Sequence, residues 1–202
     1  MFKKIKKFLR VLLRVQQLKF YGKNNIVDYK KSVSFNTFKV KVYGNNNKIL
    51  IDEKVHLNKI SINIGFPNNP VNNSLIKIGE NTGFQNVHIQ VGEDDSFITI
   101  GKDCMCSFDL EINCTDHHAI LDCNGALLNR GRSVEIGDNV WIGKEVRIMK
   151  NSKIPNGCVV AQRSVVTKKF EIENCVLAGN PAKIVKENIF WSKKRPNSFL
   201  SK

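Results

Sequence analysis

Aliphatic residues recur every six positions over the C-terminal part of the chain. Six consecutive positions of this series are occupied: Ile136, Ile142, Ile148, Ile154, Val160 and Val166. Four positions after each of the first five stands a smaller or branched residue: Val140, Val146, Ser152, Cys158 and Ser164. A period of six fits neither the 3.6-residue period of an amphipathic helix nor a simple hairpin, whose turns would interrupt the count. The pattern predicts a solenoid of short β-strands.

Such a solenoid closes on itself as a prism. Three sides of six residues make one coil of about 18 residues, and successive coils stack about 4.8 Å apart by pairing their backbones. The aliphatic residue of each unit is expected to point inward and the small residue to lie near a corner. Ile100 and Cys106 continue the count upstream, and Ile100 precedes Ile136 by 36 residues, or two coils. By the same count Cys104 and Cys158 are inward residues of one column, three coils apart.

The repeat is looser toward the N-terminus and stops after Val166. Residues 51–55 and 78–82 still resemble the repeat, and the Asn- and Pro-rich stretch 67–73 predicts a protruding loop, because Asn tolerates left-handed backbone angles. We expect the β-helix to occupy residues 23–186. Residues 187–202 are expected to form a C-terminal helix or arm that closes the end of the prism, with residues 187–194 as its helical part.

The opening segment has a different pattern, with apolar residues at steps of three and four. They are Phe2, Ile5, Phe8, Leu9, Leu12, Leu13 and Leu18. Lysines and arginines occupy the other face, so we predict a basic amphipathic helix over residues 1–22. It could lie on an anionic membrane surface, or pack on its own domain or a neighbouring subunit.

Composition and charge narrow the class of protein. The chain has 202 residues, with 42% hydrophobic and 25% charged residues, as expected for one globular domain. Residues 1–31 hold ten Lys or Arg against Asp28 alone, so they supply +9 of the formal charge of +14. The remainder is only mildly basic and shows no nucleic-acid-binding module. No apolar stretch is long enough for a transmembrane anchor, and the opening segment is not a convincing signal peptide.

Six cysteines stand without a C-x-x-C pair, which indicates a reduced, cytosolic chain rather than a disulfide-bonded or zinc-binding one.

Four segments resemble a known family in order and in spacing. They read TDHHAILD at 115–122, IGDNVWIG at 136–143, SVVTK at 164–168 and AGNPAK at 178–183. From about residue 78 to 186 the chain is therefore similar to the hexapeptide-repeat acyltransferases, and most of all to bacterial O-acetyltransferases of capsule, O-antigen and sialic-acid sugars.

The resemblance implies an all-β, left-handed parallel β-helix, although general crossover rules alone would have favoured a right-handed one. It implies acetyl-CoA as co-substrate, a sugar or polysaccharide acceptor, and no metal. It also implies a homotrimer with sites between subunits. From the cysteines and the basic opening segment, we expect the protein in the cytoplasm or at the inner face of the membrane.

Moving an acetyl group to a sugar hydroxyl needs a base, and a neutral imidazole is suited to this near pH 7. The motif makes His118 the catalytic histidine, whereas the six-residue count gives it an inward phase; we follow the motif and keep His117 as the alternative. Neighbouring strand residues face opposite sides, so both can serve one substrate only if the strand is locally distorted. Asp116 or Asp122 is expected to orient the imidazole or bind the sugar, although each would also suit a turn. Trp141, with a backbone N–H, is expected to stabilise the oxyanion.

The resemblance also places coenzyme A along a groove between neighbouring prisms. The residues expected to line it are Trp141, Gly143, Ala161, Arg163, Ser164, Lys168 and Lys183. Arg163 departs from the family, which usually has a small residue there.

Three other mechanisms or functions stay open. An acyl-enzyme could form on Cys114 or Cys123. A zinc lyase of the γ-carbonic-anhydrase kind would need His88, His117 and His118 to share one metal. The third is a β-helix scaffold without activity. The acceptor is not readable from the sequence, and its selectivity is expected to lie in residues 66–74 and 122–134.

Overall fold

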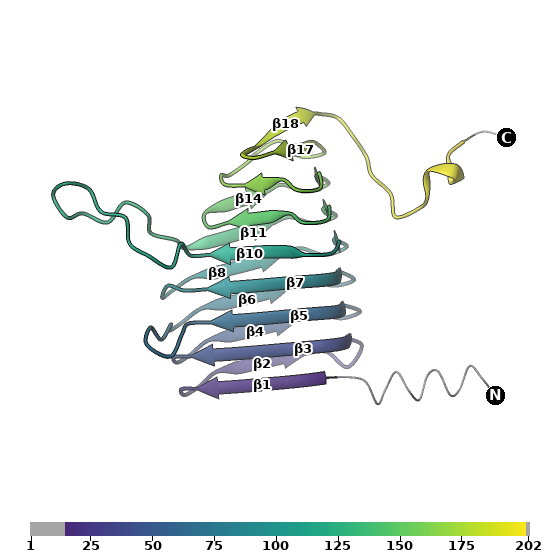
Figure 1. The fold of residues 1–202 in the computed structure, drawn as a ribbon. Helices are drawn as coiled ribbons and strands as arrows, with labels where there is room; N and C mark the ends of the chain where they lie inside the picture. Colours follow the sequence, from purple (N-terminus) through teal and green to yellow (C-terminus); the bar gives the residue numbers. More distant parts are fainter. Residues whose placement is uncertain (1–14, 201–202) are drawn as a thin grey trace, which may run out of the picture.

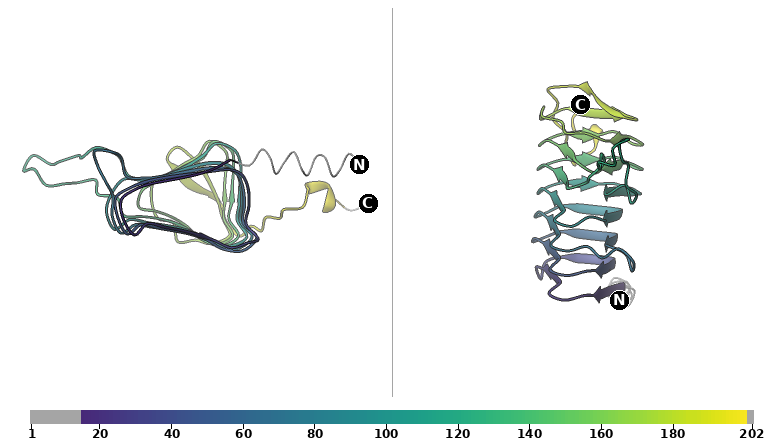
Figure 2. Two further views of the ribbon diagram at one scale, coloured as in Figure 1. Left: turned by 90° about the horizontal axis from the view of Figure 1, so that it is seen from below. Right: turned by 90° about the vertical axis from the view of Figure 1, so that its left-hand side faces the viewer.

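The computed structural model describes residues 15–200, which wind into a parallel β-helix (Figure 1). Seen along the axis, the coils superimpose as a prism, with the loop 115–132 projecting from one side and the C-terminal arm from the other (Figure 2). The larger sheet contains β1 (Val15–Tyr21), β3 (Ser34–Tyr43), β5 (His56–Ile64), β7 (Gly83–Val91), β9 (Met105–Cys106), β10 (Leu110–Cys114), β12 (Trp141–Ile142), β13 (Arg147–Met149), β15 (Val159–Val160), β16 (Val165–Val166), β17 (Val176–Gly179) and β18 (Ala182–Lys186). The smaller sheet contains β2 (Ile26–Tyr29), β4 (Lys48–Ile51), β6 (Leu75–Ile78), β8 (Phe97–Ile100), β11 (Ser133–Ile136) and β14 (Ser152–Ile154).

The larger sheet supplies two faces of the prism and the smaller sheet the third. In the first coils one long strand crosses both faces, as β3, β5 and β7 do. Higher in the stack two short strands replace it: β7 pairs with β9 through residues 83–84 and with β10 through residues 87–91. Parallel pairing in register keeps each inward position above the equivalent position of the coil below.

The core follows the six-residue pattern. Every aliphatic residue of the series from Ile136 to Val166 is 3% exposed or less, and the small residues from Val140 to Ser164 are equally buried. The interior is therefore a stack of aliphatic layers whose corners hold small side chains, and this prediction is confirmed.

Residues in the left-handed conformation turn the chain at the corners. At the corner that follows the smaller sheet, one such residue stands in each of five coils, with φ between 52° and 67°: Lys54, Asn81, Asp103, Asn139 and Gly157. Asn and Asp adopt this conformation at low cost, because their short polar side chains can bond locally. The side chains also pair between coils, as the amide of Asn81 donates to the carboxylate of Asp103 at 2.6 Å.

The predicted number of coils was wrong between residues 100 and 136. Ile100 pairs directly with Ile136, and Met105 with Trp141, so these residues belong to adjacent coils and not to coils two apart. Cys104 and Cys158 are accordingly two coils apart. The 36 intervening residues comprise one coil and the excursion 115–132. Because the excursion is as long as a coil, the aliphatic residues after it keep the six-residue spacing. The spacing alone therefore does not reveal the excursion.

Both predicted end segments differ from the structure. Residues 15–21 form strand β1, parallel to β3, so the helix predicted over residues 1–22 is wrong there; residues 1–14 lie outside the described part of the chain. Backbone pairing with the open edge of β3 outweighs the helical spacing of the apolar residues. Residues 187–194 are not helical either, because antiparallel β18 closes the stack and an irregular arm follows, with a single 3₁₀ turn at Pro196–Ser198. Among residues 15–200 no helix is long and apolar enough to cross a membrane.

Close stacking makes Gly101 intolerant of a side chain. A Cβ at Gly101 would lie 2.4 Å from Oδ1 of Asp138 and 2.5 Å from the backbone of Gly137, whereas a Cβ at Gly83 would meet nothing within 4 Å. We expect Gly101→Ala to destabilise the protein by about 1–3 kcal/mol, as overpacking does, and Gly83→Ala to have little effect. Urea unfolding of both variants checks this. Equal midpoints for the two variants would contradict the observed spacing between coils.

Candidate active site

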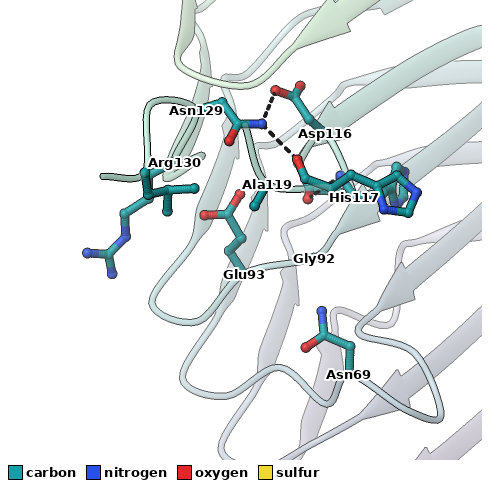
Figure 3. A pocket seen from close by; sticks show the side chains of 11 residues that line it. Asn69, Gly92, Glu93, Asp116, His117, Ala119, Asn129 and Arg130 are labelled. Carbon is teal, nitrogen blue, oxygen red and sulfur yellow. Dashed lines mark hydrogen bonds between the residues drawn. The ribbon is translucent and has the colours of Figure 1, made fainter. Parts of the chain in front are cut away.

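Three successive coils differ in length at the corner where the larger sheet ends. Residues 65–74 connect β5 to β6, the short turn 92–96 connects β7 to β8, and the long loop 115–132 connects β10 to β11. The short middle turn leaves a cleft of about 190 Å³ between the two longer segments (Figure 3). The cleft is lined by Asn69, Gly92, Glu93, Thr115, Asp116, His117, His118, Ala119, Leu127, Asn129 and Arg130.

Both predicted histidines are exposed and line this cleft. His117 has φ 64°, and its amide donates to Oγ1 of Thr115 at 3.0 Å. His117 thus provides the local distortion that both histidines need in order to face one cleft. Its left-handed conformation breaks the strand alternation that would send the two side chains to opposite sides. His118 does not take the inward position that the six-residue count gave it, since the chain leaves the repeat at the start of the loop.

The ring of His117 is placed by the lower segment. Its centroid lies 5.3 Å from that of Phe66, with the rings inclined at 62°. The segment 65–74 thus reaches past the short turn to touch the upper loop, and it protrudes as predicted.

The outer part of the loop is a hairpin. Leu121 and Leu127 form an antiparallel bridge, and Oδ1 of Asp122 accepts hydrogen bonds from the amides of Asn124 and Ala126, both at 2.8 Å. Asp122 therefore forms the turn of the hairpin.

The base of the loop is held by charged and amide groups. Nζ of Lys150, from the turn between β13 and β14, lies 2.6 Å from Oδ2 of Asp116. The side-chain amide of Asn129 donates to the same oxygen and to the carbonyl of His118, both at 2.9 Å (Figure 3). Burial raises the pKa of Asp116, but the hydrogen bonds from Lys150 and Asn129 outweigh it and leave the pKa below its ordinary value. On the other strand of the loop, both carboxylate oxygens of Glu93 accept from the amide of Gly131, at 2.9 and 3.0 Å.

Trp141 lies on a different face, away from the histidines of its own chain. It is 38% exposed on β12, and its ring lies 6.1 Å from that of Trp191 in the C-terminal arm. The arm is fixed there because Nε1 of Trp191 donates to the carbonyl of Asn139 at 2.6 Å. A second, apolar cleft of about 520 Å³ runs between this face and the arm, past Val159 and Val176. Trp141 is thus a cleft wall rather than a core residue, as expected.

The residues predicted for coenzyme binding divide between surface and interior. Ser164 is only 1% exposed, and its hydroxyl accepts from the amide of Gly179, so it fills a corner rather than a groove. Gly143 is needed for stacking, because a Cβ there would lie 2.6 Å from the nitrogen of Gln162. Ala161 beside it is half-buried.

The predicted phosphate-binding cations are exposed. Nε of Arg163 pairs with Glu145 at 2.6 Å, and Nζ of Lys168 lies 5.3 Å from the centre of the Phe170 ring. Lys183 stands on β18 at the closed end of the stack.

The other predicted chemistries find less support in this geometry. Burial raises the pKa of the Cys114 thiol to about 12, which leaves little thiolate for an acyl-enzyme, while Cys123 is exposed in the hairpin. His88 lies within β7, opposite Glu111 of β10, and does not line the cleft of His117 and His118. Within residues 15–200 no three His, Cys, Asp or Glu side chains are grouped to hold a metal ion.

Sequence reasoning missed the groups that hold the cleft together. Phe66 and Asn129 fall in the two segments expected to govern selectivity, but neither was singled out. Glu93 and Lys150 gave no signal at all, because each follows a strand where a charged turn residue is common.

Comparison with known proteins places the chain in a class. The family described as bacterial transferase hexapeptide (six repeats) matches residues 133–168. A polysialic acid O-acetyltransferase from Neisseria meningitidis is 37% identical over 126 residues, or 62% of this chain, and one from Escherichia coli O1:K1 / APEC is 34% identical over 113 residues, or 55%. These matches span 58% and 36% of the relatives' own lengths, respectively.

The fold agrees over a larger part of the chain. The crystal structure of the polysialic acid O-acetyltransferase OatWY superimposes with a TM-score of 0.63 and 31% identity, covering 89% of this chain and 94% of that one. The prism is therefore a left-handed β-helix, as the resemblance implied. The chain belongs to the hexapeptide-repeat acyltransferases.

The low pKa of Asp116 predicts how pH affects its contribution to stability. A carboxylate whose pKa is lower in the folded state stabilises that state above its ordinary pKa, about 3.9, and loses the effect as the pH falls through the lowered value. We expect Asp116→Asn to lower the free energy of unfolding by about 1 kcal/mol or less at pH 7, because the pair is partly exposed. The difference from the wild type should shrink below about pH 4. Unfolding measured from pH 7 to pH 3 checks this, and a difference that grows on acidification would contradict it.

Proposed function

We propose that this protein transfers an acetyl group from acetyl-CoA to a hydroxyl of a capsule or other cell-surface polysaccharide. The observation that carries the proposal is the cleft that gathers His117 and His118 where the repeat is interrupted. The relatives named polysialic acid O-acetyltransferases make a sialic acid polymer the first acceptor to test. An O-antigen sugar is the other acceptor class.

The proposed reaction is a direct transfer. A nitrogen of His118 accepts the proton of the acceptor hydroxyl, and the oxygen attacks the thioester carbonyl. The tetrahedral oxyanion collapses to the ester, and coenzyme A leaves as the thiol after receiving the proton from the imidazolium. A backbone N–H and Trp141 stabilise the oxyanion. No residue of the protein forms a covalent bond in this scheme.

The separation between His118 and Trp141 bears on assembly. The two residues line different clefts of one chain. One reaction centre that uses both would combine the loop of one subunit with the β12 face of its neighbour, which supports a homotrimer with shared sites. The apolar wall formed by Trp141 and Val159 would suit the pantetheine arm, and the exposed Lys168, Lys183 and Arg163 would suit its phosphates.

We place the reaction in the cytoplasm, where acetyl-CoA is made. The excess of lysines and arginines in residues 1–31 would favour contact with the inner surface of an anionic membrane.

The proposed function is tested by incubating the protein with labelled acetyl-CoA and a panel of polymers. The panel contains polysialic acid, a neutral capsule polysaccharide and an O-antigen, and NMR locates the ester in any product. Label in one polymer identifies the acceptor class. Acetyl-CoA turnover without label in any polymer, or no turnover at all, would contradict the proposal.

Replacing the base should remove transfer and spare coenzyme binding. We expect His118→Ala to lower kcat by about 10²–10⁴-fold, since positioned general-base catalysis contributes that much. Acetyl-CoA affinity measured by calorimetry should stay near that of the wild type. His56→Ala is the matched control, because His56 is exposed on β5 and bonds Ser34 outside the cleft. Full turnover by His118→Ala together with loss in His117→Ala would move the role to His117.

A further inference from the structure

The loop that carries the histidines has little apolar support of its own. Four of its large apolar side chains are between 51% and 64% exposed: Ile120, Leu121, Leu127 and Leu128. Apolar burial therefore does not determine where the base of the loop stands. A segment with so few buried contacts opens at low cost unless other interactions hold it.

Polar contacts converge instead on Asn129. Its side-chain amide nitrogen donates to the carbonyl of His118 and to Asp116, and its Oδ1 accepts from the amide of Ile120 at 2.7 Å. One side chain thus bonds the outgoing strand of the loop at three points, from the opposite strand. Asp116 and Ile120 lie two residues before and two residues after His118, and the third point is the carbonyl of His118 itself.

Lys150 connects this set to the rigid stack. Its Nζ contacts Oδ2 of Asp116 and also donates to the carbonyl of Asn129. Lys150 follows β13 in the coil above, whose strand pairs with β10 directly before the loop. Its side chain is only 15% exposed, so the ion pair is partly removed from water and screened less than a surface pair.

We propose that Lys150 and Asn129 are positioning residues that fix the main chain on both sides of His118 and so hold its imidazole over the cleft. The proposal rests on the proposed function for its kinetic consequence. Neither residue touches the reacting atoms in this scheme, and Lys150 acts through Asp116 and Asn129. Asp116 is then part of the support of the histidine rather than a sugar ligand.

Kinetics of Lys150 variants test the proposal. Misplacing a catalytic group by about 1 Å can cost on the order of 10²-fold, so we expect Lys150→Met to lower kcat by about 10–100-fold, with KM for acetyl-CoA within about 2-fold of the wild type. Lys150→Arg keeps the charge and should recover most of the loss. Lys153→Met is the matched control. Lys153 pairs with Glu171 on the smaller sheet, away from the cleft, so Lys153→Met should retain wild-type kcat.

Asn129→Ala should lower kcat as Lys150→Met does. The double variant should have a kcat no lower than that of the poorer single variant, because the two residues act as one unit.

A second measurement reports the position of the loop without relying on activity. Trypsin cleavage after Arg130 requires the strand next to Asn129 to open. We expect Lys150→Met to be cleaved there at least several-fold faster than the wild type and Lys153→Met, with similar thermal midpoints for all three. If neither the wild type nor any variant transfers acetyl to an acceptor while this difference in cleavage appears, the proposed function fails, but Lys150 is still shown to hold the loop.

Three results would overturn the proposal. They are unchanged kcat and unchanged cleavage in Lys150→Met, a kcat loss in Lys150→Arg as large as in Lys150→Met, and strictly multiplicative losses in the double variant.

Discussion

The parallel pairing of each coil with the next is the interaction on which the rest of this structure depends. It satisfies the backbone along the faces, brings one aliphatic layer over another, and requires each corner to repeat the same turn. Left-handed Asn and Asp residues at the corners follow from that requirement, as do glycines such as Gly101, where the next coil leaves no room for a Cβ. The result is a rigid scaffold in which a side chain's position is set by its phase within the coil.

The candidate chemistry lies where this pairing is interrupted. The excursion 115–132 leaves the stack for the length of a coil and rejoins it in register, so β10 and β11 still pair with their neighbours. Inside the excursion the periodic core cannot hold the chain, and Lys150, Asn129 and Asp116 take over that task. The coils below and above thereby support a pair of exposed histidines. Under the proposed function, this arrangement would combine access for a large polymer with a defined position for the base.

The molecule has a second cleft on another face of the prism. The face of β12, β15 and β17 is covered in part by the C-terminal arm, which Trp191 attaches to the corner at Asn139. Under the proposed function, separate clefts would let a large acceptor and a long coenzyme each approach from its own side. The arm and the strands line this second cleft together, so both would contact a coenzyme bound there.

The sequence by itself determined the prism, its inward residues and the histidine segment, because each depends on spacing within one or two repeats. Ile136 to Val166 are buried as their six-residue phase requires, and Trp141 is a surface residue for the same reason. Only the tertiary structure decided that Ile100 and Ile136 are direct neighbours, that residues 15–21 add a strand to β3, and that Lys150 reaches Asp116. These three depend on which segments meet after the chain has stacked. A phase of six cannot distinguish a coil from an excursion of equal length, and a lysine after one strand does not reveal the loop that lies below it.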